Sequence, residues 1–168
     1  PIETPGPDGL FGETSVGPQY RDPKNGRIIQ FHQQRLFTAP RCERKDYFDY
    51  VKTVVENSHR VFYRISLDQG VSWGELQQLM EYGDQYNPRH WAEGVTFMEG
   101  TAVLGEPPPF HRLDDGRLVF PCQKRSTDDE AIYGTIQAGR FFAEWHHDGR
   151  DLTWRSGGRG PGGGCGQT

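Results

Sequence analysis

The chain has 168 residues, of which 33% are hydrophobic, 12% are aromatic and 25% are charged, and its formal net charge is −4. This length suits one domain rather than two, and the modest hydrophobic share with many aromatic residues predicts a small core of Phe, Tyr and Trp. The acidic balance argues against a general polyanion-binding surface but allows a local basic cleft. Because no apolar run has membrane-spanning length, we expect no membrane partner.

The two ends of the chain are expected to be flexible. Residues 1–28 are rich in Pro, Gly and Asp without hydrophobic periodicity, which predicts a mobile arm. A Gly run dominates 157–168 and predicts a flexible tail. The folded domain is therefore expected at 29–156. Because the chain begins with Pro1 rather than Met, we expect a processed product or a fragment.

The first half of the predicted domain contains the helical signals. Short alternation at 28–37 predicts an edge strand or one arm of a hairpin. The best helix candidate is 41–58, where aromatic and Val side chains recur on one face and Asp46 lies near the start. A strand is expected at 61–66. A second short helix is expected at 72–82, because its first residues have capping-box spacing.

The second half consists of short strands and turns. Asp-Gly sequences between aromatic and β-branched runs are strong hairpin signals. They predict a hairpin at 110–120, strands at 131–136 and 139–145 joined by a turn at 137–139, a turn at 146–149 and a third strand at 151–155. The predicted fold class is α+β, with one main helix packed on a twisted antiparallel sheet. The predicted core consists of Tyr47, Val51, Val54, Phe97, Ile132, Phe141 and Trp145.

Three cysteines, Cys42, Cys122 and Cys165, allow one disulfide and one free thiol. A secreted protein would pair Cys42 with either of the other two, and the sequence does not choose between them. The chain has no CxxC pair and no histidines at zinc-ligand spacing, so we expect neither a metal nor another cofactor.

Three short segments share their order and spacing with one known family. They are LVFP at 118–121, DEAIY at 129–133 with its spacing on to His146, and Tyr86 with His90 followed by Glu93-Gly94. Together they resemble the small secreted fungal guanyl-specific ribonucleases and ribotoxins, and the ribonuclease-like effectors of plant-pathogenic fungi. The last third of the chain matches best. The resemblance implies a microbial-ribonuclease-like fold and a secreted protein that acts in virulence, including delivery into host cells.

Two positions depart from the family's pattern. The resemblance places Val119 at the catalytic Glu and Glu130 at the phosphate-binding Arg. RNA cleavage requires a base for the 2′-hydroxyl and a cation for the phosphorane, and neither substitute supplies these functions. His146 can still protonate the leaving oxygen. We therefore favour a pseudo-ribonuclease over an active enzyme.

The favoured hypothesis is a monomeric secreted effector that binds host RNA or a host protein without efficient cleavage. The alternative is an active endoribonuclease that uses His90 and His146 as an acid–base pair, with phosphate bound by Arg112, Lys124 or Arg125. In either case the substrate contacts are expected from Tyr86, Glu93, Arg112 and His147.

Other interpretations are open. A bacterial or viral domain that converged on similar hairpins would show a different sheet topology. The His146-His147 pair is also typical of a solvated turn, and His90 before Trp91 of a packed side chain. His90 and Cys122 follow the order of permuted papain-like enzymes, but the Asn-Cys helix of that family is absent.

Overall fold

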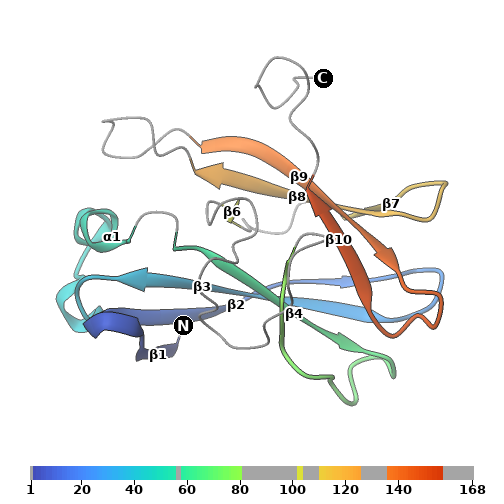
Figure 1. Cartoon of the computed structure of the whole chain (residues 1–168), viewed down its shortest axis with the longest axis horizontal. Helices are drawn as coiled ribbons and strands as arrows, with labels where there is room; N and C mark the ends of the chain where they lie inside the picture. Colours follow the sequence, from blue (N-terminus) through green and yellow to red (C-terminus); the bar gives the residue numbers. More distant parts are fainter. Residues whose placement is uncertain (1, 56–57, 81–101, 104–109, 126–135, 157–168) are drawn as a thin grey trace.

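The computed structural model describes residues 2–55, 58–80, 102–103, 110–125 and 136–156. These residues form two five-stranded antiparallel sheets that pack against each other (Figure 1). Sheet A contains β1 (Ile2–Pro5), β2 (Phe11–Arg21), β3 (Ile28–Phe37), β4 (Arg60–Ser66) and β5 (Gln77–Gln78), side by side in chain order. Sheet B has the order β10 (Leu152–Ser156), β9 (Ile136–Trp145), β8 (Leu118–Arg125) and β6 (Ala102–Val103), with β7 (His111–Arg112) also paired to β8.

Aromatic rings fill the space between the sheets. Phe31 from β3 lies at the centre, with its ring centroid 5.2 Å from Phe120, 6.1 Å from Phe141 and 5.8 Å from Trp154. Phe31, Phe120 and Phe141 are fully buried. Full burial of one such ring contributes about 1.5–3 kcal/mol, so this cluster explains how a chain with few aliphatic residues forms a core. Two predicted core residues belong here, because Phe141 is buried and Trp145 packs partly buried against the cluster.

The predicted α+β fold with one main helix is wrong, because the described residues are mostly strands. The helix expected at 41–58 is reduced to α1 (Tyr47–Thr53), preceded by the 3-10 turn η2 (Arg41–Glu43). Asp46 does cap α1, since its carboxylate accepts a hydrogen bond from the backbone N–H of Asp49. The helix stops at Val54, which turns extended and bridges to Phe37 of β3. Pairing with a neighbouring strand therefore overrides the helical pattern.

The second predicted helix, at 72–82, is also wrong over its described part. Ser72 does not cap a helix; its backbone N–H and its hydroxyl both donate to the carboxylate of Asp68. The chain then joins sheet A as β5, where Gln77 and Gln78 pair with β4. A side chain that bonds to its own loop competes with helix formation, which explains the failure of the capping-box signal.

The segment expected to be a mobile arm instead forms two strands. β2 pairs with β3 from Phe11 to Arg21, and β1 pairs with β2. β3 therefore lies inside sheet A between β2 and β4 and is not an edge strand, but it is one arm of the β2–β3 hairpin, the other alternative that the sequence allowed. The β2–β3 register shifts between Val16 and Gln19, at the Gly-Pro pair that suggested disorder. Glycine and proline are typical of such bulges, because proline cannot donate to the strand ladder. The short 3-10 turn η1 (Pro7–Gly9) joins β1 to β2.

Several local predictions are confirmed. β3 has the predicted bounds, β4 matches the strand at 61–66, and the hairpin at 110–120 is formed by β7 and β8. The turn at 146–149 closes with the N–H of Gly149 donating to the oxygen of His146. The predicted turn at 137–139 is wrong, because β9 runs through it unbroken and stays paired with β8.

Of the other predicted core residues, Val54 is half-buried. The side chains of Tyr47 and Val51, and the whole of Phe97 and Ile132, lie outside the described part of the chain. No helix within the described ranges is long and apolar enough to cross a membrane.

Candidate functional site

Half of the predicted site residues can be placed. Tyr86, His90, Glu93 and Glu130 lie outside the described residues. Arg112, Val119, His146 and His147 are described, and all four belong to sheet B or to the turn between β9 and β10. Arg112 is bonded to a buried carboxylate, the two histidines occupy an exposed turn, and Val119 faces outward from sheet B.

Arg112 is neutralised by a buried carboxylate. Its Nη1 lies 2.5 Å from Oδ2 of Asp22, whose side chain is fully buried on the β2–β3 turn. The same Oδ2 accepts a hydrogen bond from Nε1 of Trp145 at 2.8 Å, and Oδ1 accepts one from the N–H of Lys24 at 2.9 Å. We call Asp22, Arg112 and Trp145 the Asp22 clasp. It joins sheet A to sheet B, so Arg112 contributes to structure rather than to an open phosphate site.

Two further side chains extend the Asp22 clasp. The Tyr20 hydroxyl is buried without a hydrogen-bond partner among the described residues. Burial, and then the nearby charge of Asp22, raise the pKa of Tyr20, while Arg112 opposes this shift. The guanidinium of Arg27 lies 5.1 Å from the centre of the Trp145 ring. The Asp22 clasp is therefore flanked by a buried tyrosine hydroxyl and by a cation–π contact.

His146 and His147 occupy the exposed turn after β9. Nε2 of His146 is 2.9 Å from Oγ1 of Thr153, a contact across the β9–β10 hairpin. The N–H of Arg150 donates to the carboxylate of Asp148 and lowers its pKa, and the two histidines lower it further. Both histidines are exposed, in agreement with the interpretation as turn residues.

Val119, at the position where the resemblance expects a catalytic Glu, points away from the core. Alternate residues of β8, such as Leu118 and Phe120, are buried, so Val119 belongs to the outer face of sheet B. The strand register places it between His111 of β7 and Phe142 of β9. Phe142 in turn lies opposite Arg155 of β10. These four residues form one row across the outer face.

Phe142 is surrounded by arginines. The guanidinium carbon of Arg117 is 5.2 Å from the centre of the Phe142 ring, and that of Arg140 is 5.9 Å away. Both distances are within the range of cation–π attraction. Arg155 pairs directly across from Phe142, about 5 Å away by the usual strand spacing. We call Phe142, Arg117, Arg140 and Arg155 the Phe142 face.

The charge of the Phe142 face is partly compensated. Nη2 of Arg117 lies 2.7 Å from Oδ2 of Asp115, and both side chains are about half exposed. Hydrogen bonds from Arg117 lower the pKa of Asp115. Glu144, two residues beyond Phe142 on β9, is exposed on the same side. Arg140 is exposed and makes no ion pair with any described residue. The face is thus a local basic surface on a chain that is acidic overall.

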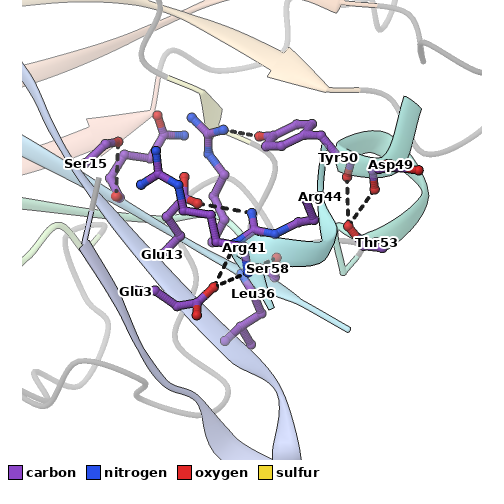
Figure 2. A network of polar contacts seen from close by, with 12 residues as sticks. Glu3, Glu13, Ser15, Leu36, Arg41, Arg44, Asp49, Tyr50, Thr53 and Ser58 are labelled. Carbon is purple, nitrogen blue, oxygen red and sulfur yellow. Dashed lines mark hydrogen bonds and ion pairs between the residues drawn. The ribbon is translucent and has the colours of Figure 1, made fainter. Parts of the chain in front are cut away.

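A second polar network, shown in Figure 2, fastens the other end of sheet A. The guanidinium of Arg44 is almost fully buried and lies 3.1 Å from both Glu3 and Glu13. Its carbon is 3.6 Å from the centre of the Phe37 ring. Arg35 nearby donates to the hydroxyl of Tyr50. Because the buried Arg44 is paired with both Glu3 and Glu13, this network holds the segment before α1 against β1 and β2.

The described cysteines and acidic groups form neither a disulfide nor a metal-binding cluster. Cys42 is exposed in η2 and Cys122 is buried in β8, and the two are not joined in a disulfide. Cys165 lies outside the described residues, so its pairing with Cys42 stays a prediction. No group of three His, Cys, Asp or Glu side chains within the described ranges could hold a metal ion.

The comparisons with known proteins assign no family. No protein-family model matches the chain, and no curated protein matches it significantly. The resemblance to fungal ribonucleases therefore stays a prediction, although the sandwich differs from the fold that it implies. The sequence did not predict the Phe142 face, because the hairpin pattern assigned Phe141 and Trp145 to the core and gave Phe142 no role. The alternation of Arg140, Phe142 and Glu144 along 139–145 was the available signal.

Proposed function

We propose that this protein is a β-sandwich that binds single-stranded RNA on the Phe142 face without cleaving it efficiently. The observation that supports this proposal is an outward-facing Phe ring with two guanidinium groups within 6 Å and a third arginine across the strand pair. An aromatic ring on a sheet surface stacks on an unpaired base, and arginines beside it bind the adjoining phosphates. This is the RNA-binding form of the favoured sequence hypothesis.

Single strands suit the face better than duplexes. A ring lying on a sheet reaches only bases that have left their stack, and A-form helices keep their bases inside. The arginines around Phe142 have exposed side chains, which can move aside when a base enters. Base–aromatic stacking contributes about 1–3 kcal/mol per base, so one ring has a measurable effect on affinity.

The experiment is a fluorescence-anisotropy titration of a 12-nucleotide single-stranded RNA and of its duplex, at low salt. Phe142→Ala should weaken single-strand binding roughly 5- to 150-fold, the equivalent of about 1–3 kcal/mol. Phe142→Trp should retain it, and Arg140→Ala should weaken it and lower its salt dependence. Arg21→Ala is the matched control, because Arg21 is an exposed arginine on sheet A.

The same titration separates the alternatives. The proposal is wrong if the folded protein does not bind the RNA, or if Phe142→Ala binds like the unaltered chain. Intact RNA after prolonged incubation supports a binding function. Cleavage that His146→Ala abolishes would instead support the endoribonuclease hypothesis, with His90 as its second group. Secretion, a host-protein target and a role in virulence stay predictions from the resemblance.

A further inference from the structure

Glu144 places a carboxylate beside the Phe142 face. It follows Phe142 by two positions on β9, with the buried Ala143 between them, so both side chains lie on the outer side of sheet B. The Glu144 side chain is exposed and makes neither a hydrogen bond nor an ion pair with any described residue. Its direct cross-strand neighbour, Thr153 of β10, has its hydroxyl oxygen 2.9 Å from Nε2 of His146. The acceptor oxygens of Glu144 are therefore available to a ligand.

Two arginines lie on either side of this carboxylate. Arg117 directly precedes β8, and the register of β8 with β9 puts it on the β8 side of Glu144. The hydrogen bond and the charge of Asp115 raise the pKa of Arg117, and the nearby charge of Glu144 raises it further. Arg155 lies on the β10 side, diagonally from Glu144, at about 7–8 Å by the usual strand geometry. The outer side of sheet B thus has the order cation, carboxylate, cation.

The backbone of a single RNA strand has a matching order of groups. Phosphates alternate with riboses, and each ribose carries a 2′-hydroxyl that can donate a hydrogen bond. Within the strand this hydroxyl is the one donor of the sugar–phosphate backbone, because the phosphate and ring oxygens only accept. A carboxylate accepts hydrogen bonds and repels phosphates, so the 2′-hydroxyl is the part of this backbone that Glu144 can bind. A DNA strand lacks that hydroxyl and offers the carboxylate no partner in its backbone.

We propose that Glu144 accepts a hydrogen bond from a ribose 2′-hydroxyl and thereby makes the Phe142 face select single-stranded RNA over single-stranded DNA. This inference rests on the RNA-binding function proposed above. Phe142 stacks on the base, and Arg117 and Arg155 contact the phosphates on either side of the ribose that Glu144 binds. On DNA the same carboxylate still repels the phosphates but gains no hydrogen bond. Because a hydrogen bond to a charged acceptor is stronger than a neutral one, the preference for RNA should be at least about five-fold.

The experiment is a fluorescence-anisotropy titration of the full chain with 12-nucleotide single strands of one A and C sequence, made as RNA, DNA and 2′-O-methyl RNA. The methyl group keeps the 2′-oxygen but removes its donor, so 2′-O-methyl RNA should bind like DNA, at least about five-fold more weakly than RNA. Glu144→Ala should bring the three affinities within about two-fold of one another, chiefly because DNA and 2′-O-methyl RNA bind more tightly. Glu144→Gln removes the charge but keeps an acceptor oxygen, so it should strengthen all three and retain part of the preference.

Asp115→Asn is the matched control, because Asp115 is an exposed carboxylate whose oxygens already bond to Arg117. This substitution should change the RNA and DNA affinities by the same factor. Equal affinities of the unaltered chain for the three strands would overturn the inference, and so would a preference for RNA that Glu144→Ala leaves intact. If Phe142→Ala still weakens binding in either case, the stacking site itself stands. No binding of any strand by the folded protein would overturn both proposals.

Discussion

Replacing Asp22 by Asn tests whether the Asp22 clasp holds the two sheets together. The carboxylate is fully buried and accepts bonds from Arg112 at 2.5 Å, Trp145 at 2.8 Å and the N–H of Lys24 at 2.9 Å. Asn keeps the shape, but it offers one acceptor oxygen and brings two donors into a site where every neighbour is a donor. It also leaves the Arg112 cation, whose side chain is 22% exposed, without a counter-charge.

Removal of one partner from a buried ion pair costs about 3–5 kcal/mol of unfolding free energy. For a domain of this size each kcal/mol lowers the melting temperature by about 2–4 °C, so Asp22→Asn should lower it by roughly 6–20 °C. Urea denaturation followed by tryptophan fluorescence measures the loss. A double-mutant cycle with Arg112→Met should show a coupling of more than about 1 kcal/mol, because the second substitution removes the uncompensated cation.

The exposed pair Asp115–Arg117 is the matched control. Both side chains are about half exposed, and Asp115→Asn should leave the urea midpoint unchanged. The reasoning is refuted if Asp22→Asn is as stable as the unaltered chain. It is also refuted if the two substitutions at Asp22 and Arg112 are additive, since the ion pair would then contribute nothing of its own.

Two further predictions concern pH. Burial, and then the charge of Arg64, lower the pKa of His32, so the folded chain favours the neutral imidazole. The stability that this preference contributes should be complete above pH 6.5 and should decline below it. The urea midpoints at pH 7.5 and pH 5.0 should therefore differ less in His32→Gln than in the unaltered chain. An equal decline in that variant would contradict this role. Hydrogen bonds from Ser72 lower the pKa of Asp68 to about 2, so an NMR titration of the Asp68 carboxylate should have its midpoint there. In Ser72→Ala the midpoint should move toward 3.8. The stability contributed by the ionised carboxylate is complete above pH 3.8 and is lost as the pH falls through 2. A midpoint of 3.8 in the unaltered chain would show that the loop is not held by this carboxylate.

The turn of the 110–120 hairpin and the turn at 146–149 were predictable because their signals are local, unlike the turn wrongly predicted at 137–139. The hairpin at 110–120 closes through a bond from the N–H of Leu113 to the oxygen of Arg117, and Gly116 takes a φ of 92° that other residues avoid. Gly149, with a φ of 63°, does the same in the β9–β10 turn. The turn-closing hydrogen bond and the left-handed glycine of each turn lie within five positions of one another, so the local sequence is enough to predict these two turns.

The layout of the sheets was not predictable in this way. Val54 leaves the helical pattern because Phe37, 17 positions earlier, offers it a strand partner. β2 contains the Gly-Pro pair that suggested a mobile arm, yet its bonds to β3 extend from Phe11 to Arg21. Both outcomes depend on contacts between separate segments, which override local propensity.

The Phe142 face illustrates the same limit for the candidate site. The alternation along β9 was visible, but the arrangement of Val119, Phe142 and Arg155 in one row follows from the register of two strand pairs. The resemblance to ribonucleases used LVFP at 118–121 as a catalytic strand. In the sandwich its first and third residues, Leu118 and Phe120, fill the core, and Val119 faces outward. Such alternation is common to antiparallel strands in general and does not specify one family.

The arginines of the described residues have two kinds of surroundings. Arg44 and Arg112 are bonded to carboxylates that are buried or partly buried; Arg44 fastens the segment before α1 to β1 and β2, and Arg112 joins the two sheets. A charge in that position cannot move toward a ligand without a large cost in stability. Arg117 and Arg140 instead lie over an aromatic ring on an exposed sheet, where a base or a phosphate can replace their present contacts at little cost. The proposed RNA site therefore rests on the exposed arginines around Phe142, because the enclosed arginines are engaged in ion pairs that hold the fold.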